Sequence, residues 1–181
     1  MAIKTFTTGE VLTASDTNTY LANSGLVYIK QQTIGSAVAT VNVTSAFSNT
    51  YDNYKVVIAG GSSTSSQPLK LQFGSTATGY NFALIYAAYA TNAVAGACAA
   101  NAAQINYVGQ AVISGILACI EIGSPNVATT TEVSAPYFDA VNAGHLSAYL
   151  NNTTQYTDFT FGPLSGTMTG GTVTVYGYRK A

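Results

Sequence analysis

Fifty consecutive residues in the middle of this chain, Leu71 to Ile120, contain no Asp, Glu, Lys or Arg. Their apolar runs are broken by Asn, Gln, Gly and Ser, so none approaches the roughly 18 apolar residues that a membrane-spanning helix needs. Disorder is also excluded, because it requires low hydrophobicity and high charge, whereas 48% of the whole chain is hydrophobic and 7% is charged. The stretch must therefore form folded elements that do not insert into a membrane.

Alternation of apolar and polar residues predicts that these elements are strands. Leu69, Leu71 and Phe73 alternate with Lys70 and Gln72, which is the pattern of a half-buried strand. Similar segments recur with turn signals every 8–12 residues or so, as in β-sandwiches. We expect an all-β, jelly-roll-like antiparallel β-sandwich with strands near 26–34, 39–44, 54–59, 69–73, 81–90, 111–122, 129–138, 145–150, 159–161 and 171–179.

Three segments between or within these strands have their own expected conformations. The polar stretch 60–67 is predicted to be a flexible loop that ends at Pro68. Gly115 suggests a β-bulge inside the long apolar strand 111–122. The small-residue stretch 93–103 is compatible with either a loop or a short helix.

The segment 81–90 is apolar on both faces of the expected strand. Phe82 and Leu84 would lie on one face, and Ile85 and Tyr89 on the other. Such a strand is typically buried on both sides. We therefore expect a second sheet on one face and a neighbouring subunit on the other, and we predict a homotrimer.

The N-terminal residues 1–25 read as an arm separate from the sandwich body, 26–181. Thr13 and Asp16 are spaced as in a capping box, although such boxes usually end in Glu or Gln. Gly25 falls where a helix C-cap would lie. We expect an extended segment followed by a helix of two or three turns, which is too short to be stable alone. A solvated N-terminal turn is the alternative.

Residues with catalytic or metal-binding chemistry are few. His145 is the only histidine, and Cys98 and Cys119 are the only cysteines. A zinc site needs about four ligands, and a glycosidase needs two neighbouring carboxylates. Glu121, Glu132 and Asp139 are the only acids between Asp52 and Asp158, and two of them could meet across strands. We expect no catalytic residue, no metal and no cofactor.

Charge and the N-terminus limit location and partners. A net charge of −1 argues against nucleic acid and against anionic lipid surfaces. The first six residues lack the apolar core of an export signal, so we expect no export signal and reduced cysteines.

Two phrases and the last strand resemble one family of proteins. The arm sequence GEVLTASDTNTYL, Gly9 to Leu21, is similar to the phrase GEVLTAADxNxYL near the N-termini of tailed-bacteriophage structural proteins. Phe47 to Ile58 resembles the FssxYdNYrivi segment of phage tail-fibre and related virion proteins, and VTVYGY at Val173–Tyr178 resembles their closing strand.

This resemblance implies a non-enzymatic virion protein, assembled in the host cytoplasm. It would be a tail fibre or appendage that contacts other virion proteins through its arm, with host-surface glycans as candidate ligands. A capsid decoration protein is the alternative, and a jelly-roll carbohydrate-active enzyme or lectin is a further one. The implied assembly residues are Phe6, Glu10, Val11, Leu12, Asp16, Asn18, Tyr20 and Leu21.

Polar loops at the ends of a sandwich are the expected places for host contact, because loops tolerate variation and carry function. The candidate loops are 60–67, 75–80 and 151–156, which are rich in hydroxyl and amide side chains. The candidate residues are Ser62, Ser63, Thr64, Tyr80, Asn151, Asn152 and Tyr156.

Overall fold

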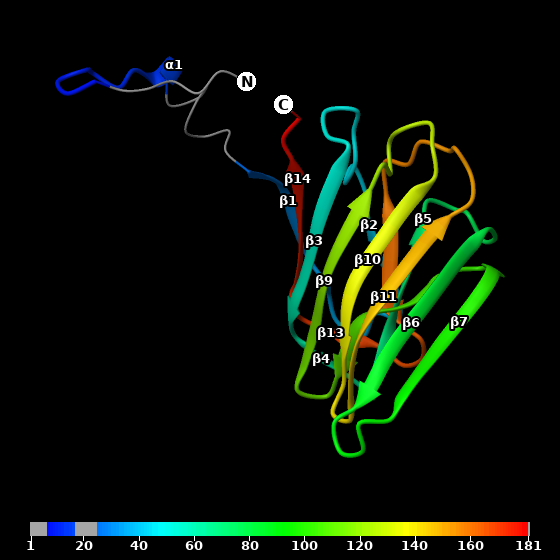
Figure 1. Ribbon diagram of the computed structural model, residues 1–181. Helices are drawn as coiled ribbons and strands as arrows, with labels where there is room; N and C mark the ends of the chain where they lie inside the picture. Colours follow the sequence, from blue (N-terminus) through cyan, green and yellow to red (C-terminus); the bar gives the residue numbers. More distant parts are fainter. Residues whose placement is uncertain (1–6, 17–24, 181) are drawn as a thin grey trace.

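Antiparallel strands make up nearly all the regular structure in the computed structural model, which describes residues 7–16 and 25–180 (Figure 1). The predicted all-β sandwich is confirmed. The strands are β1 (Leu26–Thr33), β2 (Val41–Val43), β3 (Asn53–Gly60), β4 (Ser62–Ser63), β5 (Gln67–Phe73), β6 (Tyr80–Ala88), β7 (Val94–Ala102), β8 (Ile105–Val112), β9 (Gly115–Gly123), β10 (Thr131–Phe138), β11 (Asn142–Leu150), β12 (Phe159–Pro163), β13 (Met168–Thr169) and β14 (Thr172–Tyr178).

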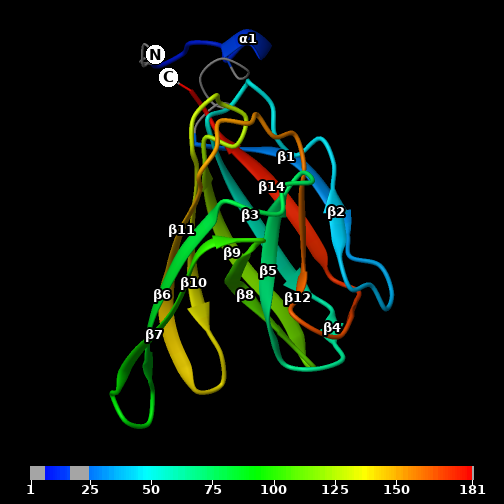
Figure 2. The same cartoon turned by 90° about the vertical axis from the view of Figure 1, so that its right-hand side faces the viewer.

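The strands form two layers that are joined through one hairpin (Figure 2). The layer that we call the long sheet has the order β1-β14-β3-β9-β10-β11-β6-β7. The short sheet has the order β2-β12-β5-β8, and the end of β8 pairs with the start of β9, which links the layers. β4 and β13 form a separate small pair.

The core lies between the two layers and is rich in aromatic rings. Tyr54 from β3, Phe73 from β5 and Phe159 from β12 are fully buried. Phe47 joins them, with ring centroids 4.8 Å from Tyr54 and 5.5 Å from Phe159. Alternation in the sequence places these rings on one face of each strand, which explains why the simple period of two predicted so many strands.

Strand register defines two ends of the sandwich. Leu26 at the start of β1 pairs with Tyr178, so β1 begins at the same end where β14 finishes. We call this the arm end, because β1 begins there, directly after the N-terminal segment. Hairpins at 89–93, 113–114 and 139–141 lie at the opposite end, the far end, as Figure 1 shows.

Two expectations about single segments are wrong. The segment 111–122 is not one strand with a bulge at Gly115, because β8 ends at Val112 and pairs with Gly115 across a two-residue turn. The turn is formed by Ile113 and Ser114. Apolar residues continue on both sides of it, so the Ser114-Gly115 turn signal was interpreted as a bulge within one strand. The stretch 60–67 is not wholly a loop either, because it contains β4.

The stretch 93–103 is neither a loop nor a short helix, the two conformations that its sequence allowed. It forms β7, a strand of Ala, Gly, Val, Cys and Asn residues that pairs with β6. Alanine and glycine have low strand propensity, so the pairing with β6 decides the conformation and not the local sequence.

Candidate functional site

The N-terminal segment contains the predicted capping box. The backbone N–H of Asp16 donates to Thr13 Oγ1 at 3.1 Å, and the N–H of Thr13 donates to Asp16 Oδ2 at 3.1 Å. This reciprocal pair starts the short helix α1, Ala14–Asp16. Asp16 reaches the Thr13 N–H despite being shorter than Glu. The expected helix length beyond Asp16 lies outside the described residues.

Apolar side chains in this segment are open to solvent. Val11 is 79% exposed and Leu12 is 49% exposed. Glu10 accepts a hydrogen bond from the Thr7 N–H at 3.1 Å, which turns the chain just before them. The other predicted assembly residues, Phe6, Asn18, Tyr20 and Leu21, lie outside the described residues. The division of the chain at residue 25 stays a prediction.

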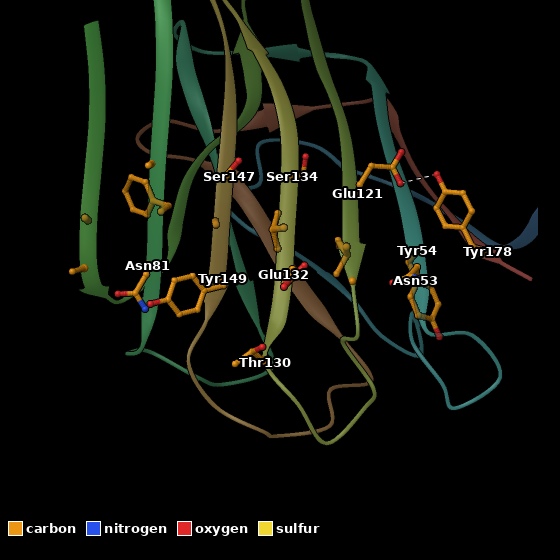
Figure 3. Close-up of a pocket in the computed structure, with 18 residues that line it drawn as sticks. Asn53, Tyr54, Asn81, Glu121, Thr130, Glu132, Ser134, Ser147, Tyr149 and Tyr178 are labelled. Carbon is orange, nitrogen blue, oxygen red and sulfur yellow. Dashed lines mark hydrogen bonds between the residues drawn. The ribbon is translucent and has the colours of Figure 1, made fainter. Parts of the chain in front are cut away.

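A hollow lies on the solvent face of the long sheet, in its arm-end half, and has a volume of about 1040 Å³ (Figure 3). We call it the outer groove. Residues of seven strands line it: β7, β6, β11, β10, β9, β3 and β14. The polar and aromatic residues that line it are Asn53, Tyr54, Asn81, Phe82, Glu121, Thr130, Glu132, Ser134, Ser147, Tyr149 and Tyr178.

Small side chains in one cross-strand row create this hollow. Ser134 on β10 pairs with Ser147 on β11, and Ser147 pairs with Ala83 on β6. The next row toward the arm end is taller, because Glu132 pairs with Tyr149 and Tyr149 pairs with Asn81. Tyr149, which is 45% exposed, therefore stands as a wall beside a floor of hydroxyl groups.

Glu121 lies toward the β14 side of the outer groove and has two partners. Its Oε1 accepts from Lys55 Nζ at 2.9 Å, and its Oε2 accepts from the Tyr178 hydroxyl at 2.7 Å (Figure 3). The hydrogen bond to Glu121 raises the pKa of Lys55 and also raises the pKa of Tyr178. This carboxylate is therefore committed to a structural cluster.

Glu132 lies on the same face as Glu121 and is exposed. Glu121 pairs with Ser134, two residues along β10 from Glu132. Diagonal neighbours of this kind are about 7–8 Å apart. The two acids therefore share one groove, although Glu121 turns toward Tyr178 and away from Glu132 in Figure 3.

His145 is also on this face, next to the groove. Its Nε2 lies 3.3 Å from Ser134 Oγ. A catalytic serine triad would need an acid on the imidazole, but Glu121 is on β9, whereas His145 is on β11, on the opposite side of Ser134. Within residues 7–16 and 25–180, no group of three or more His, Cys, Asp or Glu side chains is placed to bind a metal.

The three predicted host-contact loops do not share one end. Loops 75–80 and 151–156 are adjacent at the arm end, where the Asn151 N–H donates to Gly79 O at 2.9 Å. The stretch 60–67 follows β3 at the far end. Ser62, Thr64, Asn151 and Asn152 are at least partly exposed.

The other three predicted contact residues are buried, so the expectation is wrong for them. Tyr80 is 0% exposed, Tyr156 is 4% exposed and Ser63 is 5% exposed. The hydroxyl of Tyr80 accepts from the Phe73 N–H at 2.7 Å, and that of Tyr156 contacts Thr76 Oγ1 at 2.7 Å. Their polar tips hold loops in place, which is the usual role of a buried tyrosine hydroxyl.

Sequence reasoning missed most of the outer groove. Asn81, Ser134, Ser147 and Tyr149 each occupy the solvent side of an alternating strand, and that alternation was the available signal. Their convergence depends on which strands are neighbours, which a single strand does not encode.

No known protein-family description, curated protein sequence or solved structure matches this chain. In the described part of the chain, no helix has the length and apolar character needed to cross a membrane.

Proposed function

We propose that this chain is a non-enzymatic structural protein of a tailed-phage virion, an exposed appendage that attaches through its N-terminal arm and binds a neutral host glycan in the outer groove. The observation that carries the proposal is the outer groove itself. It combines an exposed aromatic wall, Tyr149, with a floor of serine hydroxyls on a rigid sheet.

The chemistry of the groove favours a neutral polyhydroxyl ligand. A tyrosine ring can cover the C–H face of a sugar ring, while Ser134 and Ser147 can pair with hydroxyl groups. The Asn81 amide is held in place, because its Nδ2 donates to Gly79 O and its Oδ1 accepts from the Asn101 N–H. Glu132 adds an acceptor and a negative charge. The cation that reaches this face, Lys55, is engaged by Glu121. Anionic sugars and nucleic acids are therefore disfavoured.

Attachment through the arm rests on exposure and on the resemblance described above. Val11 and Leu12 present apolar surface just before a capped helix start, and contact with another protein would remove this surface from water. The phage-like phrase that covers these residues supports contact with other virion proteins.

Binding is tested with the full chain on an array of neutral and anionic oligosaccharides. We expect neutral ligands to bind with little dependence on salt. Tyr149→Ala should weaken binding by about tenfold or more, as truncation of an aromatic anchor typically does. The matched control is Tyr28→Ala, which removes a 60% exposed tyrosine from the same face of the long sheet but outside the groove. Equal losses in both variants would refute the groove assignment.

Location in the particle is tested by labelling purified virions with an antibody against the sandwich body. Labelling of the tail supports an appendage, whereas labelling of the head supports a capsid decoration protein. Particles without label would overturn the virion assignment. Val11→Asp with Leu12→Asp should reduce incorporation while leaving the sandwich folded.

Both Glu121 and Glu132 line the outer groove. The presence of two acids in one groove favours a second candidate function, a carbohydrate-active enzyme. The diagonal strand positions of these acids are about 7–8 Å apart, which brings both acids to one face. An inverting glycosidase needs its two carboxyl groups about 6.5–9.5 Å apart, so Glu121 would have to leave Tyr178, toward which it turns in Figure 3. The proposal expects no products after prolonged incubation with a bound oligosaccharide. Products that disappear in Glu132→Gln would establish the enzyme instead.

A further inference from the structure

The two side edges of the long sheet differ in how they are closed. Within the part of the chain that the structure describes, β7 has β6 as its only paired neighbour (Figure 1). Its nine residues, VAGACAANA, contain no charge and no proline. Natural sheets usually protect a long edge with lysine, proline or a bulge, since an open edge can pair with another chain. β7 has one register irregularity near its arm end, between Ala99 and Ala102, and is regular from Val94 to Ala99.

The opposite edge, β1, is protected. It has a register irregularity between Tyr28 and Lys30. Lys30 Nζ donates to the carbonyl oxygen of Thr44, and Gln32 Nε2 donates to Asn42 O at 3.0 Å. These side chains tie β1 to the β2 region of the short sheet. An incoming strand would have to displace them, so β1 is a poor partner for the β7 of another copy.

The direction of the backbone groups on β7 follows from the neighbours of β6. The Ala88 N–H donates to Ala93 O at 3.1 Å, and the Tyr89 N–H donates to Val141 O at 2.9 Å. The backbone N–H and C=O groups of even-numbered β6 residues therefore form hydrogen bonds with β7, and those of odd-numbered residues form them with β11. With the observed register, Ala95 and Ala97 of β7 bond to β6. The groups that point to the open edge belong to Val94, Gly96 and Cys98.

We propose that two copies of this chain pair β7 with β7, antiparallel about a twofold axis, so that one sheet continues through both. A twofold contact requires a self-complementary surface, and β7 offers small, uncharged side chains that neither clash nor repel when they face themselves. Val94 and Ile85, 74% and 66% exposed, lie beside this edge and gain cover. The pairing predicts a dimer in place of the homotrimer expected from the sequence.

Mass measurement comes first. Light scattering or sedimentation of the full chain at micromolar concentration should show a concentration-dependent dimer. A monomer at every concentration, or a trimer, overturns the proposal, because an isologous pairing of two edges cannot produce three subunits.

Amide hydrogen exchange then locates the contact without any mutation. In the dimer, the amides of Val94, Gly96 and Cys98 should be protected and should lose protection on dilution. Fast exchange of these amides at concentrations where the dimer persists would place the interface elsewhere and overturn the pairing.

Cys98→Pro removes one edge-directed N–H from each copy while sparing the bonds to β6, which is where a strand tolerates proline. Two lost hydrogen bonds should raise the dimer dissociation constant by about tenfold or more. Cys98→Thr is the matched control, since it keeps the N–H and suits a strand. A folded proline variant that dimerises like the threonine variant would contradict the proposal.

Discussion

The inner and outer faces of the same strands obey different rules. On β10, Val133, Ala135 and Tyr137 point inward and are at least 94% buried, while Glu132 and Ser134 point outward and line the groove. The inner face is set by packing, which penalises any change in volume. The outer face carries no such constraint, so it is free to hold polar and aromatic groups for binding. One period-two pattern thus encodes the packed core on one side and the polar lining of the outer groove on the other.

Phe159→Ala, on the inner face, should cause the largest loss of folding free energy. This ring is 0% exposed and stacks on Phe47 at 5.5 Å. Truncating a buried aromatic ring typically costs about 3–5 kcal/mol of folding free energy. Denaturant unfolding measures the loss, and Tyr149→Ala on the outer face is the comparison. If the two variants lose similar amounts of folding free energy, packing does not constrain the inner face more than the outer face.

Tyr80→Phe isolates a single polar contact on the inner face. The change removes the acceptor for the Phe73 N–H and the donor to Thr76 O at 3.2 Å. A buried N–H left without a partner costs about 1–3 kcal/mol. Thermal or denaturant unfolding should report that loss, and glycan binding should be unchanged. If the variant is folded but binds glycan differently, Tyr80 contributes to ligand contact after all.

Alkaline pH offers a reversible test of the same residue. Burial raises the pKa of Tyr80 from 10.0 to about 12. Its stabilising contribution is complete below pH 10.0, where the unfolded tyrosine is neutral, and is lost as pH rises from there toward about 12. Unfolding free energy should fall across this range, and less steeply in Tyr80→Phe. Equal slopes would show that other tyrosines dominate.

Glu121→Gln should have a small effect, because the outer face is solvated. Lys55 and Glu121 are 28% and 41% exposed, so their ion pair contributes at most about 1 kcal/mol. The variant should melt slightly earlier at low salt and almost normally at high salt. A loss of stability that persists in high salt would mean that the hydrogen bond from Tyr178 to Glu121, and not the ion pair with Lys55, stabilises this part of the sheet.

His145→Ala is expected to have the smallest effect. The imidazole is exposed, and Ser134 Oγ lies 3.3 Å from its Nε2. Exposed substitutions of this type usually change stability by no more than about 0.5 kcal/mol. Fold and glycan affinity should both match the parent. Large functional loss with an intact fold would assign His145 a role that the geometry does not suggest.

Local sequence predicted the inner face better than the outer groove. Leu69, Leu71 and Phe73 show their burial through alternation alone, and all three are 0% exposed. Glu132 and Tyr149 become neighbours only because β10 pairs with β11. The turn at Ile113 and Ser114 was missed because apolar residues continue on both sides of it. Pairing partners are long-range properties, so single-strand patterns do not contain them.

The position of β14 bears on how the protein is made. β14 lies between β1 and β3, yet it follows every other strand along the chain. A newly synthesised β1 therefore has no sheet to join until the ribosome has delivered Thr172 to Tyr178. Until then the nascent chain exposes apolar strand edges, which is a state that chaperones and proteases recognise. Synthesis of β14 becomes a condition for folding of the sandwich, and chains terminated before it are kept out of any assembly.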